Sequence, residues 1–154
     1  MAEIERKDKS EAQGTDSGSR WVQVITKIIE MTQDGKLTWM SRNPPHSLQA
    51  DNSTQKEYAE VVFETSFKGK TLRLYELHFY YEPPANLSGF HKILEAVGTQ
   101  LKPHWETRPV LELLDENGLS VFTFPYVAGL KDLLIAVKYQ TAGVYDLIED
   151  ILAG

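Results

Sequence analysis

The chain has no cysteine among its 154 residues. This excludes a disulfide framework, a thiolate zinc site and a cysteine nucleophile. The chain also lacks any run of 18 apolar residues, so no membrane-spanning helix is expected. Its first 20 residues carry charges throughout and have no apolar core of the kind that secretory signals contain. Together these absences predict a cytoplasmic protein with no membrane partner.

Positive charge is also scarce, with 16 Lys and Arg against 22 Asp and Glu and a net charge of −6. Binding to a phosphate backbone needs a basic face, so we expect no nucleic-acid partner. The 42% hydrophobic content is ordinary for a globular protein, and the length fits one domain. Residues 1–19 are polar and we expect a disordered N-terminal tail there, followed by a single domain over 20–154.

Periodicity predicts the elements of that domain. Apolar residues recur at helical spacing over 20–34, 90–101 and 130–151, with Ser19 as the expected N-cap of the first helix. The last helix is expected to kink or split at 141–143. Alternating, β-branched or aromatic residues predict strands at 36–40, 58–67, 71–82, 109–114 and 119–124. Residues 41–57 are expected to form a loop.

Two of these strand pairs carry turn signals. Lys68-Gly69-Lys70 separates the first pair, and Asn117-Gly118 separates the second, where both central residues are expected to take a positive φ. The order is helix, three strands, helix, two strands, helix. This order predicts an α+β fold with an antiparallel sheet of about five strands, covered on one face by helices.

The last third of the chain resembles uncharacterised small bacterial α+β proteins. The residues that carry the resemblance are the turn Asp115-Glu116-Asn117-Gly118 and the two C-terminal segments 130–137 and 140–148. In these segments the pattern is L-x-x-L-L-x-A-V-x-x-Q-x-A-G-V. The resemblance implies a bacterial α+β domain and no particular activity.

The aromatic residues of the predicted sheet point to a binding surface. Tyr and Trp are favoured where one end of the ring is buried and the other meets solvent or a partner. In the strand 71–82, apolar residues occur on both faces, so one face is left for contacts outside the core. The residues expected on this outer surface are Val62, Leu74, His78, Tyr80 and Trp105. The resulting hypothesis is a non-enzymatic protein-interaction module that binds a protein partner or forms a homodimer.

A second hypothesis places a small-ligand or metal site, with hydrolysis as one use, around His91 and His104. His91 and Glu95 are spaced i, i+4 on a predicted helix, and His104 follows nearby. The pattern H-E-x-x-H is absent, as are the G-x-S-x-G elbow, G-x-G-x-x-G and Walker loops. His78 beside Glu76 and Tyr80 is the other acid–base candidate. We therefore expect no cofactor and no metal, and a chain that is not an enzyme.

A third hypothesis follows from element order and acidity alone. Both are similar to those of type III secretion chaperones, which are acidic dimers that bind an extended effector segment. This similarity implies a chaperone function for an unfolded partner.

Overall fold

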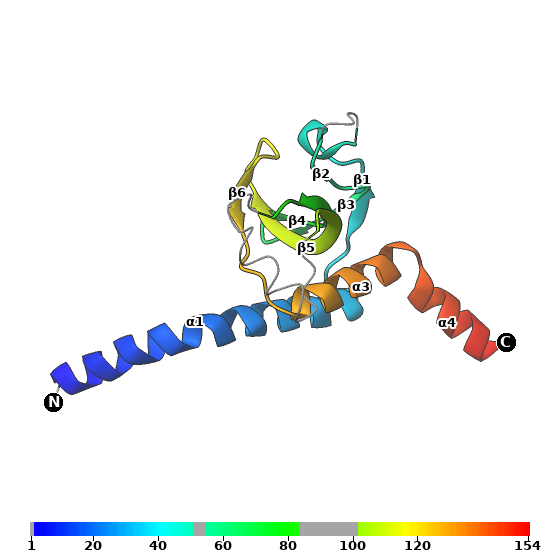
Figure 1. The fold of residues 1–154 in the computed structure, drawn as a ribbon. Helices are drawn as coiled ribbons and strands as arrows, with labels where there is room; N and C mark the ends of the chain where they lie inside the picture. Colours follow the sequence, from blue (N-terminus) through cyan, green and yellow to red (C-terminus); the bar gives the residue numbers. More distant parts are fainter. Residues whose placement is uncertain (1, 51–54, 84–101) are drawn as a thin grey trace.

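The computed structural model describes residues 2–50, 55–83 and 102–154, with the backbone alone for residues 2–16. Its elements are α1 (Ala2–Gln33), β1 (Met40–Arg42), the 3-10 helix η1 (His46–Leu48), β2 (Glu57–Tyr58), β3 (Val62–Phe67), β4 (Lys70–Tyr81), β5 (His104–Leu114), β6 (Ser120–Thr123), α3 (Gly129–Thr141) and α4 (Val144–Ala153). One antiparallel sheet lies beside a layer of helices (Figure 1). The predicted α+β class and the approximate element order are confirmed.

The sheet is built around two long strands. β4 and β5 pair from Thr71 opposite Leu114 to Tyr81 opposite His104. The strand order is β1-β3-β4-β5-β6, and the short β2 pairs with the second half of β4. The β3–β4 turn uses Lys68 at φ 49° and Gly69 at φ 79°, so the predicted hairpin turn takes two positive-φ residues.

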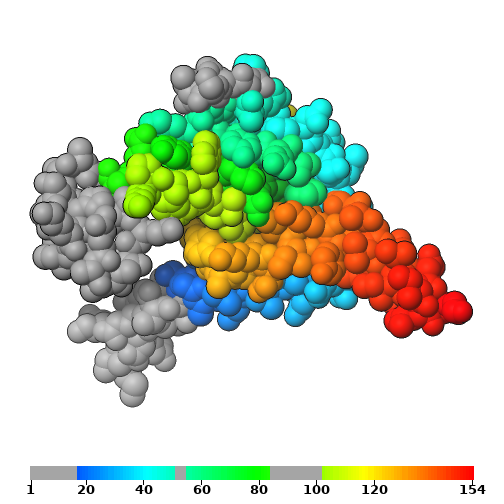
Figure 2. All heavy atoms as spheres, turned by 45° about the vertical axis from the view of Figure 1, so that its right-hand side comes forward, coloured from blue at the N-terminus to red at the C-terminus, as the bar shows by residue number. Residues whose placement is uncertain are grey.

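One face of the sheet forms the main core with α1 and α3. Phe63, Leu74 and Leu111 are side by side in the register of β3, β4 and β5. They pack with the buried helical residues Ile25, Ile28, Leu130, Leu133, Leu134 and Val137. Figure 2 shows α3, in orange, between the strands and α1. Helical periodicity on α1 and α3 therefore buries one stripe of each helix on the sheet.

The opposite face of the sheet holds a second, smaller apolar cluster. Val62 and Tyr75 are register partners there, and Leu77 and Ala59 are buried beside them. Leu48 from η1 packs against this cluster. β4 thus buries apolar residues on both faces. The helices α1 and α3 cover one face, and the segment around η1 covers part of the other.

A polar network attaches the C-terminal end of α1 to α3. The Trp39 indole N–H donates to Thr32 Oγ1 at 3.0 Å, and the Trp39 backbone N–H donates to Gln140 Oε1 at 2.8 Å. The Gln140 amide donates to the carbonyls of Thr32 at 2.9 Å and Leu37 at 2.7 Å. These bonds hold the buried Leu37 and Trp39 ahead of β1.

Several predicted boundaries are wrong. α1 begins at Ala2, so Ser19 is inside the helix rather than at its N-cap. The composition of this segment favours a helix, because Ala, Glu, Lys and Gln are strong helix formers. Glu3 and Lys7, and likewise Glu5 and Lys9, also have the favourable i, i+4 spacing. The predicted strand 36–40 is displaced to Met40–Arg42.

Other differences concern loops that contain more structure than expected. The loop predicted over 41–57 includes the end of β1, all of η1 and the start of β2. β5 begins at His104 rather than at residue 109, because Pro109 is accommodated within the strand. Asn117 does not take a positive φ; the Asp115 carboxylate instead accepts the N–H groups of Asn117 and Leu119 at 2.9 Å each. The helix predicted at 90–101 lies outside the described residues.

The C-terminal prediction of a split helix matches the structure. Gly143, at φ 71°, separates α3 from α4. The left-handed backbone at Gly143 redirects the chain, and α4 leaves the body of the molecule (Figure 1). In the described part of the chain, no helix has the length and apolar content needed to cross a membrane.

Candidate functional site

Three of the predicted surface residues are brought together on β4 and β5. Tyr80 is opposite Trp105, and His78 is opposite Tyr58 of β2. The Tyr58 and His78 rings stack with centroids 4.6 Å apart, and Trp105 lies 5.5 Å from both Tyr58 and Tyr80. We call these four residues the aromatic face. Trp105 is 50% exposed, so the face presents one large ring to solvent.

The other two predicted surface residues are buried, which corrects the prediction. Leu74 is fully buried under α1 and α3, and Val62 is buried on the opposite side of the sheet. They therefore share no surface with each other or with solvent. The prediction was wrong because both the odd and the even positions of β4 include apolar residues. Periodicity alone therefore does not say which face of the strand the helices cover.

The histidine-based site is only partly described. His91 and Glu95 lie outside the described residues, so their i, i+4 pairing stays a prediction. Across 17–50, 55–83 and 102–154, where side chains are described, no group of three His, Asp or Glu side chains is placed to hold a metal ion. His78 Nε2 lies 3.7 Å from Glu76 Oε1, too far for a strong hydrogen bond.

His104 makes two short polar contacts. Its Nδ1 is 2.6 Å from the Lys102 carbonyl, and its Nε2 is 2.7 Å from Glu106 Oε1. Both partners are acceptors, so the ring donates from both nitrogens when it is protonated. The Lys102 carbonyl, followed by the Glu106 carboxylate, raises the pKa of His104 above its ordinary value. This arrangement favours an imidazolium that is held in place, rather than a free metal ligand.

Sequence reasoning missed a buried ion pair on the η1 side of the sheet. Arg73 and Glu112 are register partners on β4 and β5, with Arg73 Nη2 3.7 Å from Glu112 Oε2. Both side chains are at least nine-tenths buried. Burial raises the pKa of the neighbouring Tyr75 well above its usual range, and the adjacent Glu112 carboxylate adds to this effect. The sequence shows Arg73 in one predicted strand and Glu112 in another, but only the strand register shows that they face each other.

A pocket of about 330 Å³ opens on the same side of the sheet. Leu48, Leu77 and Tyr126 are among its lining residues, with Arg108 and Glu57 as its charged members. The Arg108 guanidinium lies over the Phe79 ring at 5.2 Å from its centroid. The volume is at the lower limit for small-molecule sites, and the opposite charges of the two polar residues favour no single ligand class.

Among the large hydrophobic residues whose side chains are described, the two most exposed, Leu152 and Ile151, belong to α4. Its residues Leu147, Ile148, Ile151 and Leu152 are between 43% and 77% exposed, and α4 has no buried residue. We call these four residues the α4 stripe. Spacings of three and four residues place them along one side of the helix, while Asp146, Glu149 and Asp150 fall on the other side.

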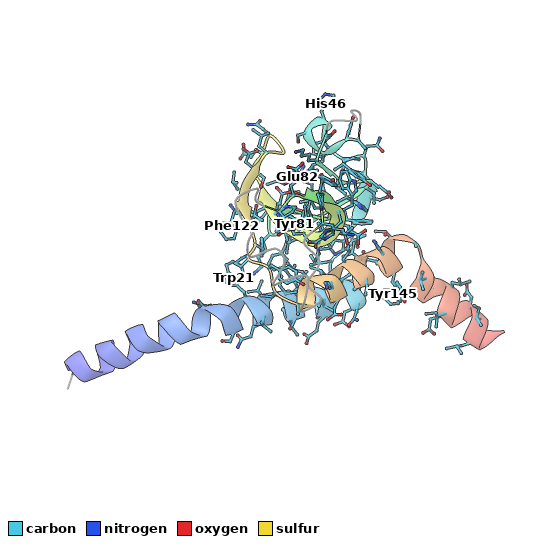
Figure 3. The ribbon with its side chains drawn as sticks, viewed as in Figure 1. Trp21, His46, Tyr81, Glu82, Phe122 and Tyr145 are labelled. Carbon is cyan, nitrogen blue, oxygen red and sulfur yellow. The ribbon has the colours of Figure 1, made fainter. Side chains whose placement is uncertain are left out.

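The apolar surface continues onto α3. Tyr145, at the start of α4, lies 5.9 Å from the Tyr139 ring, and both residues line a pocket of about 390 Å³ with Ile135 and Ile29. Ile135 and Tyr139 are themselves exposed. Tyr145 is seen at the junction of α3 and α4 in Figure 3. The helical pattern of this segment is visible in the sequence, but the pattern does not indicate that its apolar residues are exposed.

Comparison with known proteins gives no functional label for these surfaces, because the chain matches no protein-family model, no curated protein and no solved structure.

Proposed function

We propose that this chain is a non-enzymatic protein-interaction domain that binds a protein partner through the α4 stripe. The observation that carries the proposal is the exposure of all four large apolar side chains of the stripe on a helix that buries none of its residues. Exposed clusters of this kind are unfavourable in water and are typical of interaction sites on soluble domains. The proposal includes the cytoplasmic location that the sequence predicts.

The chemistry of α4 defines the kind of partner. An amphipathic helix presents its apolar residues at i, i+3, i+4 and i+7, a spacing that fits an apolar groove. The three carboxylates on the opposite side stay in solvent and contribute to the net charge of −6. Because like charges repel, this acidity favours a neutral or basic partner surface during association.

Site-specific photo-crosslinking in the host cell tests this proposal. A photoreactive phenylalanine analogue at Ile151 samples the stripe, and the same analogue at Glu149 samples the acidic side of the same helix. We expect a defined covalent protein adduct from position 151 and not from position 149. With the captured partner purified, Ile151→Lys should weaken its affinity at least about tenfold, whereas Glu149→Gln should leave it nearly unchanged. Identical adducts at both positions, or none at 151, would contradict the proposal.

The aromatic face is a second candidate surface for the same function. The observation in its favour is that Trp105 remains half-exposed while its ring contacts Tyr58 and Tyr80. Rigid aromatic side chains of this kind supply a large contact area at low entropic cost. The same crosslinker at Trp105 shows whether a partner covers this face.

A further inference from the structure

The two edges of the sheet differ in how they are protected. The β1 edge is three residues long, carries Arg42 in an ion pair with Glu64 at 3.3 Å, and is followed by Pro44-Pro45. Shortness, charge and proline are the usual devices that prevent pairing with another chain. Of these devices, the charged side chain of Arg42 most clearly disfavours pairing of β1 with a further strand.

The β6 edge is also short, at four residues, and is also followed by a proline, Pro125, but the strand carries no charged side chain. β6 pairs with β5 on one side, and within the described residues no strand pairs with its other side. Residues 119–127 contain no charged side chain, and Leu119, Val121 and Phe122 are exposed. An uncharged edge strand with exposed apolar side chains is a template for an added strand.

A helix lies beside this open edge. Trp21 of α1 stacks on Phe122 with centroids 5.8 Å apart and meets Phe124 edge-on at 5.3 Å. In Figure 3, Trp21 and Phe122 are together on the β6 side of the molecule. The part of α1 before Trp21 is ~28 Å long at 1.5 Å per residue, and it runs past the β6 side in Figure 1.

We infer that a second copy of this chain pairs at the β6 edge, with the two β6 strands antiparallel about a two-fold axis. An axis normal to the sheet joins the two sheets into one and keeps both helical layers on the same side. The two α1 helices then extend toward each other, antiparallel, beneath the joined sheet. This self-complementarity favours a second copy over an unrelated strand, because each α1 extends toward the body of the other copy.

The proposed dimer also requires contacts from α1. Stable interfaces bury on the order of 800 Å² per partner, more than a four-residue strand supplies alone. Exposed Val22 and Val24 on α1, with Phe122 on β6, add apolar side chains to the backbone pairing. The inference goes beyond the binding proposed for α4, because it uses a different element and a different occupant, and either can hold without the other.

Single-cysteine crosslinking tests the inference in a chain that has no cysteine of its own. Val121→Cys places a thiol on β6 and Met40→Cys places one on β1; the two native side chains are 58% and 57% exposed. With a short-arm bismaleimide, we expect covalent dimers from Val121→Cys and almost none from Met40→Cys. Equal crosslinking of both variants, or of neither, would overturn the inference.

Sedimentation equilibrium on lysine variants gives an independent measurement. The wild-type protein should sediment as a dimer, Val121→Lys as a monomer, and Met40→Lys and Ile151→Lys as dimers, all with the same circular dichroism spectrum. A wild-type monomer throughout the soluble concentration range overturns the inference. Dissociation by Ile151→Lys with Val121→Lys still dimeric also overturns it, and assigns self-association to α4.

Discussion

Arg73 and Glu112 face each other across β4 and β5 with 3.7 Å between Nη2 and Oε2, and both are buried on the side of the sheet away from α1 and α3. In the described part of the chain, Arg73 Nε and Glu112 Oε1 have no hydrogen-bond partner. Two charges removed from water with incomplete hydrogen bonding contribute little net stability, although removing one of them is costly. We therefore expect the pair to constrain the register of the two strands more than it stabilises the fold.

This relationship predicts strong non-additivity. Glu112→Ala should lower the free energy of unfolding by about 3 kcal/mol, because Arg73 remains as a buried, unpaired charge. The apolar pair Arg73→Met with Glu112→Leu should unfold within about 1 kcal/mol of the wild type. Urea titrations followed by circular dichroism measure both values. A double variant as unstable as the sum of its two single substitutions would refute this account.

Gln140 carries a second prediction. Its side chain accepts one backbone N–H and donates to two backbone carbonyls, so it joins α3 to the segment between α1 and β1. Gln140→Met keeps the length and apolar stem but removes all three bonds, and we expect a loss of about 2 kcal/mol of unfolding free energy. Gln33→Met, on an exposed residue of α1, is the matched control and should change stability by less than about 0.5 kcal/mol. Equal effects of the two substitutions would show that the Gln140 network is not stabilising.

The sequence carried much of the fold but less of its detail. The turn at Lys68-Gly69 and the helical stripe of α3 follow from local patterns that tertiary packing reinforces. The burial of Leu74 could not be assigned, because β4 has apolar residues in both phases and only the position of the helices distinguishes them. The Gln140 network joins residues about a hundred positions apart, and no local pattern reports such a contact.

The candidate surfaces also depend on long-range contacts that local sequence patterns do not report. The proximity of Tyr80 and Trp105 depends on the long β4–β5 register, which no local sequence pattern specifies. The exposure of the α4 stripe was missed because an apolar helical pattern reads as a core stripe whether or not something covers it. Gly143 has a left-handed backbone that turns α4 away from the body of the molecule. The sequence predicted the break between the two helices at this position but not the direction of α4.

The contacts of His104 predict a pH dependence whose sign is fixed. Because the Lys102 carbonyl and Glu106 raise its pKa in the folded protein, the charged ring contributes stability that is fully present below the unfolded value of about 6.5. That contribution is lost as the pH rises through the higher, folded value. Titration of the His104 ring protons by NMR should therefore give a pKa above 6.5.

A substitution separates the two partners of His104. Glu106→Gln removes the carboxylate and should lower the pKa of His104, while the Lys102 carbonyl keeps it above the ordinary value. Glu116→Gln is the control, because Glu116 is an exposed residue of the turn after the far end of β5. This substitution should not change the pKa of His104. A His104 pKa at or below 6.5 in the wild type would contradict the two short contacts.

The aromatic face predicts a measurable coupling between Tyr58 and Trp105. Their rings meet edge-on at 5.5 Å, and such pairs contribute about 0.5 to 1.5 kcal/mol beyond the burial of their area. A double-mutant cycle with Tyr58→Leu and Trp105→Leu should return a coupling of that size in urea unfolding. A partner that covers this face should also protect Trp105 from a soluble fluorescence quencher, whereas Trp39 is already buried and should respond little. Additive substitutions would show that the face is a set of independent side chains, and its exposed ring would then carry no argument for binding.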